Sequence, residues 1–146
     1  MGSGVMCEAA PMEISKALDY VRKNDRAVLA TKARDGTPQL SPVTLAVVDD
    51  TVVMSTRDTA FKVKNLQRDP QSWLCVFPEK WLGRWVQLEC EAEIISGEAA
   101  LDPLVEYYRT LQGEHPDWDD YRRAMVEDQR CLVRFHITKA GPDKHG

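Results

Sequence analysis

The sequence predicts a small antiparallel β-barrel with peripheral helices, an α+β fold of about six strands. Short β-branched and apolar runs recur along the chain, and turn residues such as Asp35-Gly36 and Asp49-Asp50 separate them. Other, longer segments carry apolar residues at helical spacing instead. With 146 residues, of which 43% are apolar and 29% charged, the chain is large enough for one domain with its own core.

The first half of the chain is predicted to hold a helix, a hairpin, a third strand and a basic helix. In order these are the helix Met12–Asn24, the strands Arg26–Ala33, Gln39–Val48 and Thr51–Thr56, and the helix Thr59–Arg68. Asp35-Gly36 is a strong hairpin signal, and Pro42, which lacks an N–H donor, places its strand at a sheet edge or a bulge. We expect Asp58 to cap the second helix, whose apolar stripe lies opposite Lys64 and Asn65.

The second half is predicted to contribute three strands and two helices. In order these are the strands Ser72–Phe77 and Trp85–Ile95, the helices Ala99–Gln112 and Asp117–Gln129, and the strand Arg130–Thr138. Apolar and polar residues alternate through Trp85–Ile95, which is typical of a half-exposed antiparallel strand. Asp117 is the expected cap of its helix, and the polar tail Lys139–Gly146 is expected to fray or to dock late.

Residues 1–10 are predicted to be a disordered N-terminal segment, and residues 11–146 to form the domain. The segment begins with MGSG, which is typical of residues added during cloning, and it lacks the basic and apolar regions of a signal peptide. No apolar run reaches the roughly 18 residues that span a bilayer. The net charge of -4 argues against a general nucleic-acid surface.

The cysteines predict a cytoplasmic protein with free thiols. Cys75, Cys90 and Cys131 each lie in an apolar strand-like run, where burial is expected, and Cys7 lies in the N-terminal segment. No CxxC pair or close histidine spacing points to a disulfide framework or a metal site.

The stretch Thr51–Pro70 combines groups that together bind a phosphate. A strand ends in Ser55-Thr56, and the helix after it carries Lys62, Lys64 and Arg68 in an otherwise acidic chain. Hydroxyl donors, the free N–H groups of a helix N-terminus and ammonium charge all favour an anion. The residues therefore predict a phosphate site, with ordinary strand-end hydroxyls and a solvated helix face as the alternative.

Three longer segments carry a family resemblance. They are ATKARDGTPQLSPV (30–43), VVMSTRDTAFKVKNLQRDP (52–70) and WVQLECEAEII (85–95). Their order and spacing resemble the split β-barrel, FMN-binding-like family of flavin and deazaflavin proteins related to pyridoxamine 5'-phosphate oxidase. Ser41-Pro42, the Ser55–Arg57 turn, Lys62 with Asn65-Leu66, and the stretches GEHPDWDDY and AGPDK are similar to its actinobacterial branch, which uses the deazaflavin coenzyme F420. The resemblance implies a homodimer with two cofactor sites at the interface.

The resemblance also implies contact residues for the cofactor. They are Ser41, Pro42 and Val43 beside the ring system, Ser55, Thr56 and Lys62 at the phosphate, and Trp85 and Gln87 on a strand often reached from the partner subunit. An arginine that often precedes the helix lysine in this family is absent, since Ala60 and Phe61 occupy that stretch. Arg57 or Lys64 is expected to compensate for it.

The function that the resemblance implies is that of an F420H2-dependent oxidoreductase. A hydride would pass from the reduced deazaflavin to an unsaturated or electrophilic small-molecule substrate, and the cofactor would carry most of the chemistry. The sequence shows no obvious acid–base constellation, so catalytic residues stay unassigned. The closest alternative is an FMN-binding flavoprotein of the same fold. More distant ones are a non-enzymatic protein that sequesters flavin or F420 and a dimeric binding protein.

Overall fold

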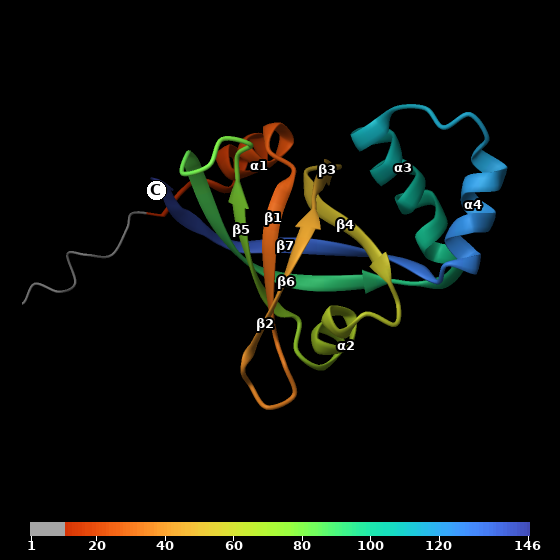
Figure 1. Ribbon diagram of the computed structural model, residues 1–146, viewed down its shortest axis with the longest axis horizontal. Coiled ribbons are helices and arrows are strands. Elements are labelled where there is room, and N and C mark those ends of the chain that lie inside the picture. Colours follow the sequence, from red (N-terminus) through yellow and green to blue (C-terminus); the bar gives the residue numbers. More distant parts are fainter. Residues whose placement is uncertain (1–10) are drawn as a thin grey trace, which may run out of the picture.

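The computed structural model describes residues 11–146, so the predictions for residues 1–10 and for Cys7 lie outside the described residues. Within that range one curled antiparallel sheet of seven strands, in the order β2-β1-β5-β6-β7-β4-β3, forms a half-open barrel with four α-helices around it (Figure 1). The strands are β1 (Arg26–Lys32), β2 (Pro38–Thr44), β3 (Ala46–Val48), β4 (Thr51–Arg57), β5 (Gln71–Phe77), β6 (Arg84–Ile95) and β7 (Arg130–His145). The helices are α1 (Ile14–Lys23), α2 (Phe61–Arg68), α3 (Leu101–Gln112), which the 3-10 helix η2 (Gly97–Ala100) precedes, and α4 (Trp118–Glu127). The predicted split-barrel fold is confirmed, with seven strands where the sequence predicts six.

The additional strand arises because the predicted strand Gln39–Val48 is divided at Leu45. The backbone N–H of Leu45 donates to the carbonyl of Asp25 over 2.7 Å, and the chain leaves the β1 ladder there. β3 then pairs with β4, while β2 remains an edge of the sheet. Pro42, opposite Val28 in that edge strand, occupies the position that its missing N–H predicts.

The C-terminal tail is part of the last strand, which extends beyond the predicted Thr138. β7 continues through His145 and pairs with the beginning of β6, where Arg84 lies opposite that histidine. Nε and Nη2 of Arg84 also donate to the carboxylate of Asp143, over 2.7 and 2.9 Å. Of the two alternatives for Lys139–Gly146, fraying is wrong, because ladder hydrogen bonds and a bidentate ion pair hold this segment.

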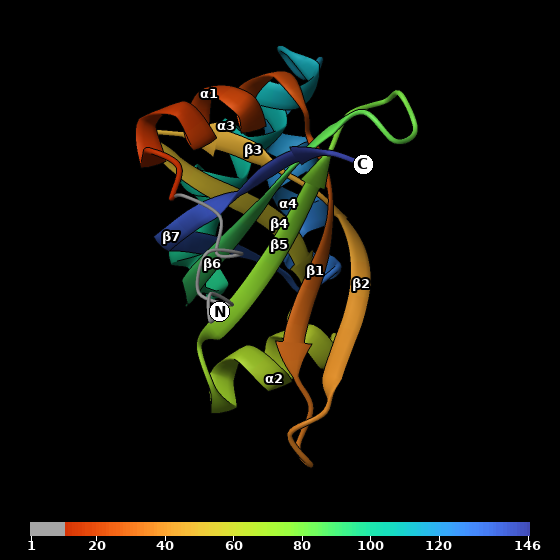
Figure 2. The same ribbon diagram turned by 90° about the vertical axis from the view of Figure 1, so that its left-hand side faces the viewer.

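The barrel interior is filled by alternating strand side chains. Leu29, Leu74, Leu88 and Phe135 are at most 1% exposed. α1 lies at one end of the barrel and α2 at the other, whereas α3 and α4 lie beside β4 and β7 (Figures 1 and 2). No helix among the described residues has the length and apolar character needed to cross a membrane.

No helix within residues 11–146 covers the outer face of β2, β1 and β5 (Figures 1 and 2). One cross-strand row on this face runs through Pro42, Val28, Cys75 and Gln87. On the same face of β2, Leu40 is 62% exposed. The described part of the chain therefore leaves a partly apolar sheet surface open to a partner.

This open face explains the one incorrect cysteine prediction. Cys90 and Cys131 are buried as predicted, but Cys75 is exposed because its side chain points away from the barrel on β5. Apolar neighbours in sequence indicated a buried strand; the absence of a covering layer is a property of the tertiary fold.

Candidate functional site

The beginning of α2 is arranged differently from its prediction. The helix begins at Phe61, its N-cap residue is Ala60, and no side chain caps it. The carboxylate of Asp58 instead accepts a hydrogen bond from the hydroxyl of Ser96 over 2.9 Å, so its prediction as the cap is wrong. Because the helix begins at Phe61, Lys62 lies in its first turn, a few residues after the end of β4.

Asn65 anchors α2 to the β1–β2 hairpin. Its Nδ2 atom donates to Thr31 Oγ1 over 3.1 Å and lies 3.4 Å from Gln39 Oε1. Its Oδ1 atom accepts from Arg68 Nη2 over 3.1 Å. Asn65 is only 6% exposed, although it lies away from the apolar stripe of the helix as predicted. The hairpin packs against that flank, and the polar network fixes the helix in place.

A cavity of about 450 Å³ opens between β2 and β4, beside α2. Its lining comes from segments far apart in sequence and consists of Arg26, Ala27, Pro42, Val43, Thr44, Ser55, Thr56, Lys62, Phe77, Tyr107 and Arg130. Arg26, Lys62 and Arg130 are cations, and no carboxylate lines the cavity, although the chain has a net charge of -4. Such a local excess of positive charge favours an anionic ligand.

Hydroxyl groups complete the lining of this cavity. Ser55 and Thr56 bring theirs from the end of β4. The hydroxyl of Tyr107 donates to the carbonyl of Thr44 over 2.9 Å and so joins α3 to β2 at the cavity wall. Burial raises the pKa of Tyr107, which therefore stays neutral at physiological pH. Cations together with neutral donors suit a phosphate group.

The structure brings together half of the contact residues predicted from the sequence. Those that line the cavity are Pro42, Val43, Ser55, Thr56 and Lys62. Ser41 does not line it, and the hydroxyl of Ser41 is buried with no hydrogen-bond partner among residues 11–146. Lys64 is exposed on α2, outside the cavity.

The other predicted contact residues, Arg57, Trp85 and Gln87, are also outside the cavity lining. Arg57 is outside the lining, with 58% of its side chain exposed, and pairs with Asp128 over 2.9 Å. Trp85 and Gln87 lie on β6, and Gln87 is three strands from Pro42 in the cross-strand row, roughly 14 Å at the usual strand spacing. Neither residue lines the cavity of its own chain.

Sequence reasoning missed Arg26, Tyr107 and Arg130. Each arginine begins a strand, where a charged residue is typical of a solvated strand end, so sequence gives no local signal for it. Only the register, which places Arg130 opposite Arg57 at the end of β4, brings it near Ser55. Tyr107 lies beside the apolar stripe of α3 and reaches the cavity because the helix packs along β3 and β4.

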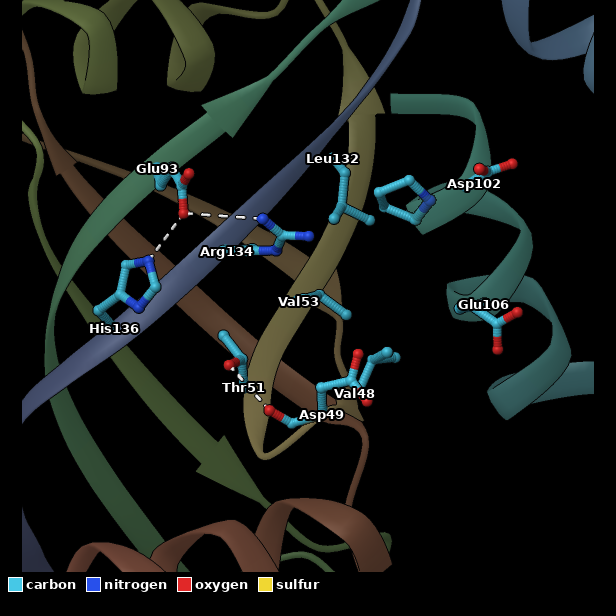
Figure 3. A pocket seen from close by; sticks show the side chains of 11 residues that line it. Val48, Asp49, Thr51, Val53, Glu93, Asp102, Glu106, Leu132, Arg134 and His136 are labelled. Carbon is cyan, nitrogen blue, oxygen red and sulfur yellow. Dashed lines mark hydrogen bonds and ion pairs between the residues drawn. The ribbon is translucent and has the colours of Figure 1, made fainter. Parts of the chain in front are cut away.

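A second cavity, of about 400 Å³, lies between α3 and the outer faces of β4, β6 and β7 (Figure 3). Glu93 Oε1 is 2.9 Å from His136 Nε2 and 3.9 Å from Arg134 Nη1. Asp102 and Glu106 of α3 also line it, and none of the predicted contact residues does. Its carboxylates disfavour a phosphate there.

The fold is that of a split-barrel protein, and cations and hydroxyl groups line a cavity at the gap between β2 and β4. The chain belongs to the pyridoxamine 5'-phosphate oxidase family, whose sequence model matches residues 14–141. This confirms the family resemblance inferred from the three sequence segments.

Solved structures of the same fold span much of the chain. The conserved hypothetical protein Rv2991 from Mycobacterium tuberculosis is 26% identical, with a TM-score of 0.75 over 92% of this chain and 86% of that one. An F420 reductase is 16% identical, with a TM-score of 0.63 over 84% of this chain and 94% of that one. The heme storage protein HutZ from Vibrio cholerae is 13% identical, with a TM-score of 0.64 over 92% and 98%. The last two likenesses concern the fold alone.

Proposed function

We propose that this protein is an F420H2-dependent oxidoreductase that reduces an unsaturated or electrophilic small molecule. The observation that carries the proposal is the cavity in which Lys62 joins Ser55 and Thr56 and which no carboxylate lines. Membership of the pyridoxamine 5'-phosphate oxidase family and a fold like that of an F420 reductase support it.

The residues present fit a cofactor that carries a phosphate. Lys62, Ser55 and Thr56 would hold the phosphate, while Pro42 and Val43 of β2 would lie beside the ring system. When bound, the reduced deazaflavin supplies the hydride. The chain contributes position, charge and exclusion of water, because neither a histidine nor a carboxylate is part of the cavity lining.

A paired titration tests the choice of cofactor. Purified protein freed of bound ligand is expected to bind F420 saturably and more tightly than FMN, as followed by the change in fluorescence of each cofactor. FMN is the informative competitor, because it presents a phosphate to the same cations. Tight FMN binding without F420 binding would refute the proposal in favour of a flavoprotein. Oxidation of F420H2 in the presence of a substrate panel then separates an enzyme from a sequestering protein.

We also propose that two copies form a homodimer through the open outer face of β2, β1, β5 and β6. The exposed apolar side chain of Leu40 and the row from Pro42 to Gln87 supply a surface that residues 11–146 leave uncovered. In a two-fold dimer of this kind, Trp85 and Gln87 would serve the cavity of the partner. Neither residue lines the cavity of its own chain, which supports that assignment.

Cys75 is a reporter of this contact, because it lies in the middle of the open face. In a Cys7→Ser variant, Cys75 is the exposed thiol among residues 11–146. Cys90 and Cys131 are buried, and burial raises the pKa of each to about 12. At pH 8 only about one in ten thousand of those buried thiols would be thiolate, the reactive form. We expect a disulfide reagent to modify Cys75 slowly at dimer-forming concentrations and faster on dilution. A dimer by sedimentation in which Cys75 reacts as quickly as in the monomer would place the interface elsewhere.

A further inference from the structure

Arg130 stands opposite Arg57 across the β4–β7 ladder, yet the two arginines have different surroundings. Arg130 lines the cavity with Ser55 and Thr56, and 32% of its side chain is exposed. Arg57 does not line the cavity, and 58% of its side chain is exposed. Like charges placed directly opposite repel each other, so this pair needs a compensating anion.

Asp128 is that anion, and it orients Arg130. Its Oδ1 atom accepts from Arg57 Nη2 over 2.9 Å, and its Oδ2 atom accepts from Arg130 Nε over 3.0 Å. These hydrogen bonds, from Arg130 above all, hold the pKa of Asp128 below its usual range. Only Nε of Arg130 is engaged, so within residues 11–146 both of its Nη atoms are without a hydrogen-bond partner. They are the donors that a guanidinium uses for bidentate contact with an oxyanion.

We propose that Arg130 binds the anionic group of the cofactor together with Lys62, and that Asp128 is the positioning residue that sets the guanidinium. The proposal rests on the proposed function of the cavity and deepens it. In this proposal the second cation of the site is Arg130 of β7, and neither Arg57 nor Lys64 supplies it. The hydroxyls at the end of β4 then share the ligand with an ammonium from α2 and a guanidinium from β7.

The test compares the dissociation constants of F420 and FMN for wild type, Arg130→Gln and Arg57→Gln. Both variants lose one hydrogen bond to Asp128, so damage to that ion pair is common to them. Arg130→Gln is expected to bind the cofactor about tenfold more weakly, because a charge-assisted contact is lost. Arg57→Gln is expected to stay within about twofold of wild type, as is Arg123→Gln, which removes the same charge from the exposed surface of α4.

A double-mutant cycle tests the positioning role of Asp128. Asp128→Asn is expected to weaken binding in the wild-type background and to have little further effect when Arg130 is already glutamine. Asp128→Glu should restore part of the affinity. An effect of Asp128→Asn that is equal in both backgrounds would show a merely structural role and overturn this part of the proposal.

The outcomes separate the inference from the function on which it rests. Wild-type protein that binds neither F420 nor FMN refutes the proposed function and the inference with it. Wild-type protein that binds a cofactor, with an unchanged dissociation constant for folded Arg130→Gln, refutes the inference alone, as does an equal loss in Arg57→Gln. Should Arg130→Gln fail to fold, Arg130→Lys keeps the charge without the bidentate geometry. Its affinity is expected to fall several-fold, and wild-type affinity would overturn the bidentate contact.

Discussion

Replacing Lys62 by alanine is expected to weaken cofactor binding by roughly 1–3 kcal/mol, which is about five- to 150-fold in the dissociation constant. The reason is the position of Lys62 in the first turn of α2, where it lines the cavity beside the hydroxyls of Ser55 and Thr56. An ammonium that contacts a phosphate contributes charge that no other group of α2 supplies to this cavity.

Lys64→Ala is the matched control for this measurement. Lys64 is on the same helix and carries the same charge, but it is exposed and lies outside the cavity. Its replacement should leave the dissociation constant within about twofold of wild type. If both variants weaken binding equally, the helix acts through its overall charge, and the direct contact assigned to Lys62 is wrong. An unchanged constant in folded Lys62→Ala would contradict the site itself.

The replacement of Asn65 by alanine is expected to lower the free energy of unfolding by about 1–3 kcal/mol. The variant loses the hydrogen bond from Nδ2 to Thr31 Oγ1 and the one from Arg68 to Oδ1, and Thr31 is fully buried. Urea denaturation measures the change, with Gln67→Ala as the control, because Gln67 is exposed on the same helix. A loss no larger than that of the control would show that the network contributes little.

The same replacement should also reduce cofactor affinity, because α2 carries Lys62 one turn before Asn65. A Thr31→Val variant tests whether the loss of stability in Asn65→Ala comes from the hydrogen bond between Asn65 and Thr31. If the pair acts as one unit, the double variant is less destabilised than the sum of the two single variants. Strict additivity would show that Asn65 and Thr31 stabilise the protein independently.

Local signals in the sequence predict much of this fold. Asp117 caps α4 by accepting from the N–H of Asp120 over 3.1 Å, as expected from its position before an amphipathic segment. Pro42 marks the edge strand, and Asp35-Gly36 joins β1 to β2. Each of these signals depends on a few neighbouring residues, and for that reason it can be found without knowledge of the tertiary structure.

The errors have a common physical origin in contacts between distant segments. Asn65 is polar and lies away from the apolar stripe of its helix, but the β1–β2 hairpin buries it. Cys75 lies in an apolar run, but no helix of the described chain covers it. The candidate site shows the same limit: Lys62 was found from its local motif, whereas Arg130 comes to the cavity only through the β4–β7 register.

The two edge strands of the sheet, β2 and β3, restrict how this protein can associate with itself. β2 is one end, and its residues 38 and 42 are prolines that offer no N–H to an incoming strand. β3 is the other end and has only three residues. Neither border is a good template for strand addition, the route by which exposed sheets grow into intermolecular aggregates. The sheet can therefore present a partly apolar face to a second chain while it resists continuous polymerisation along its edges.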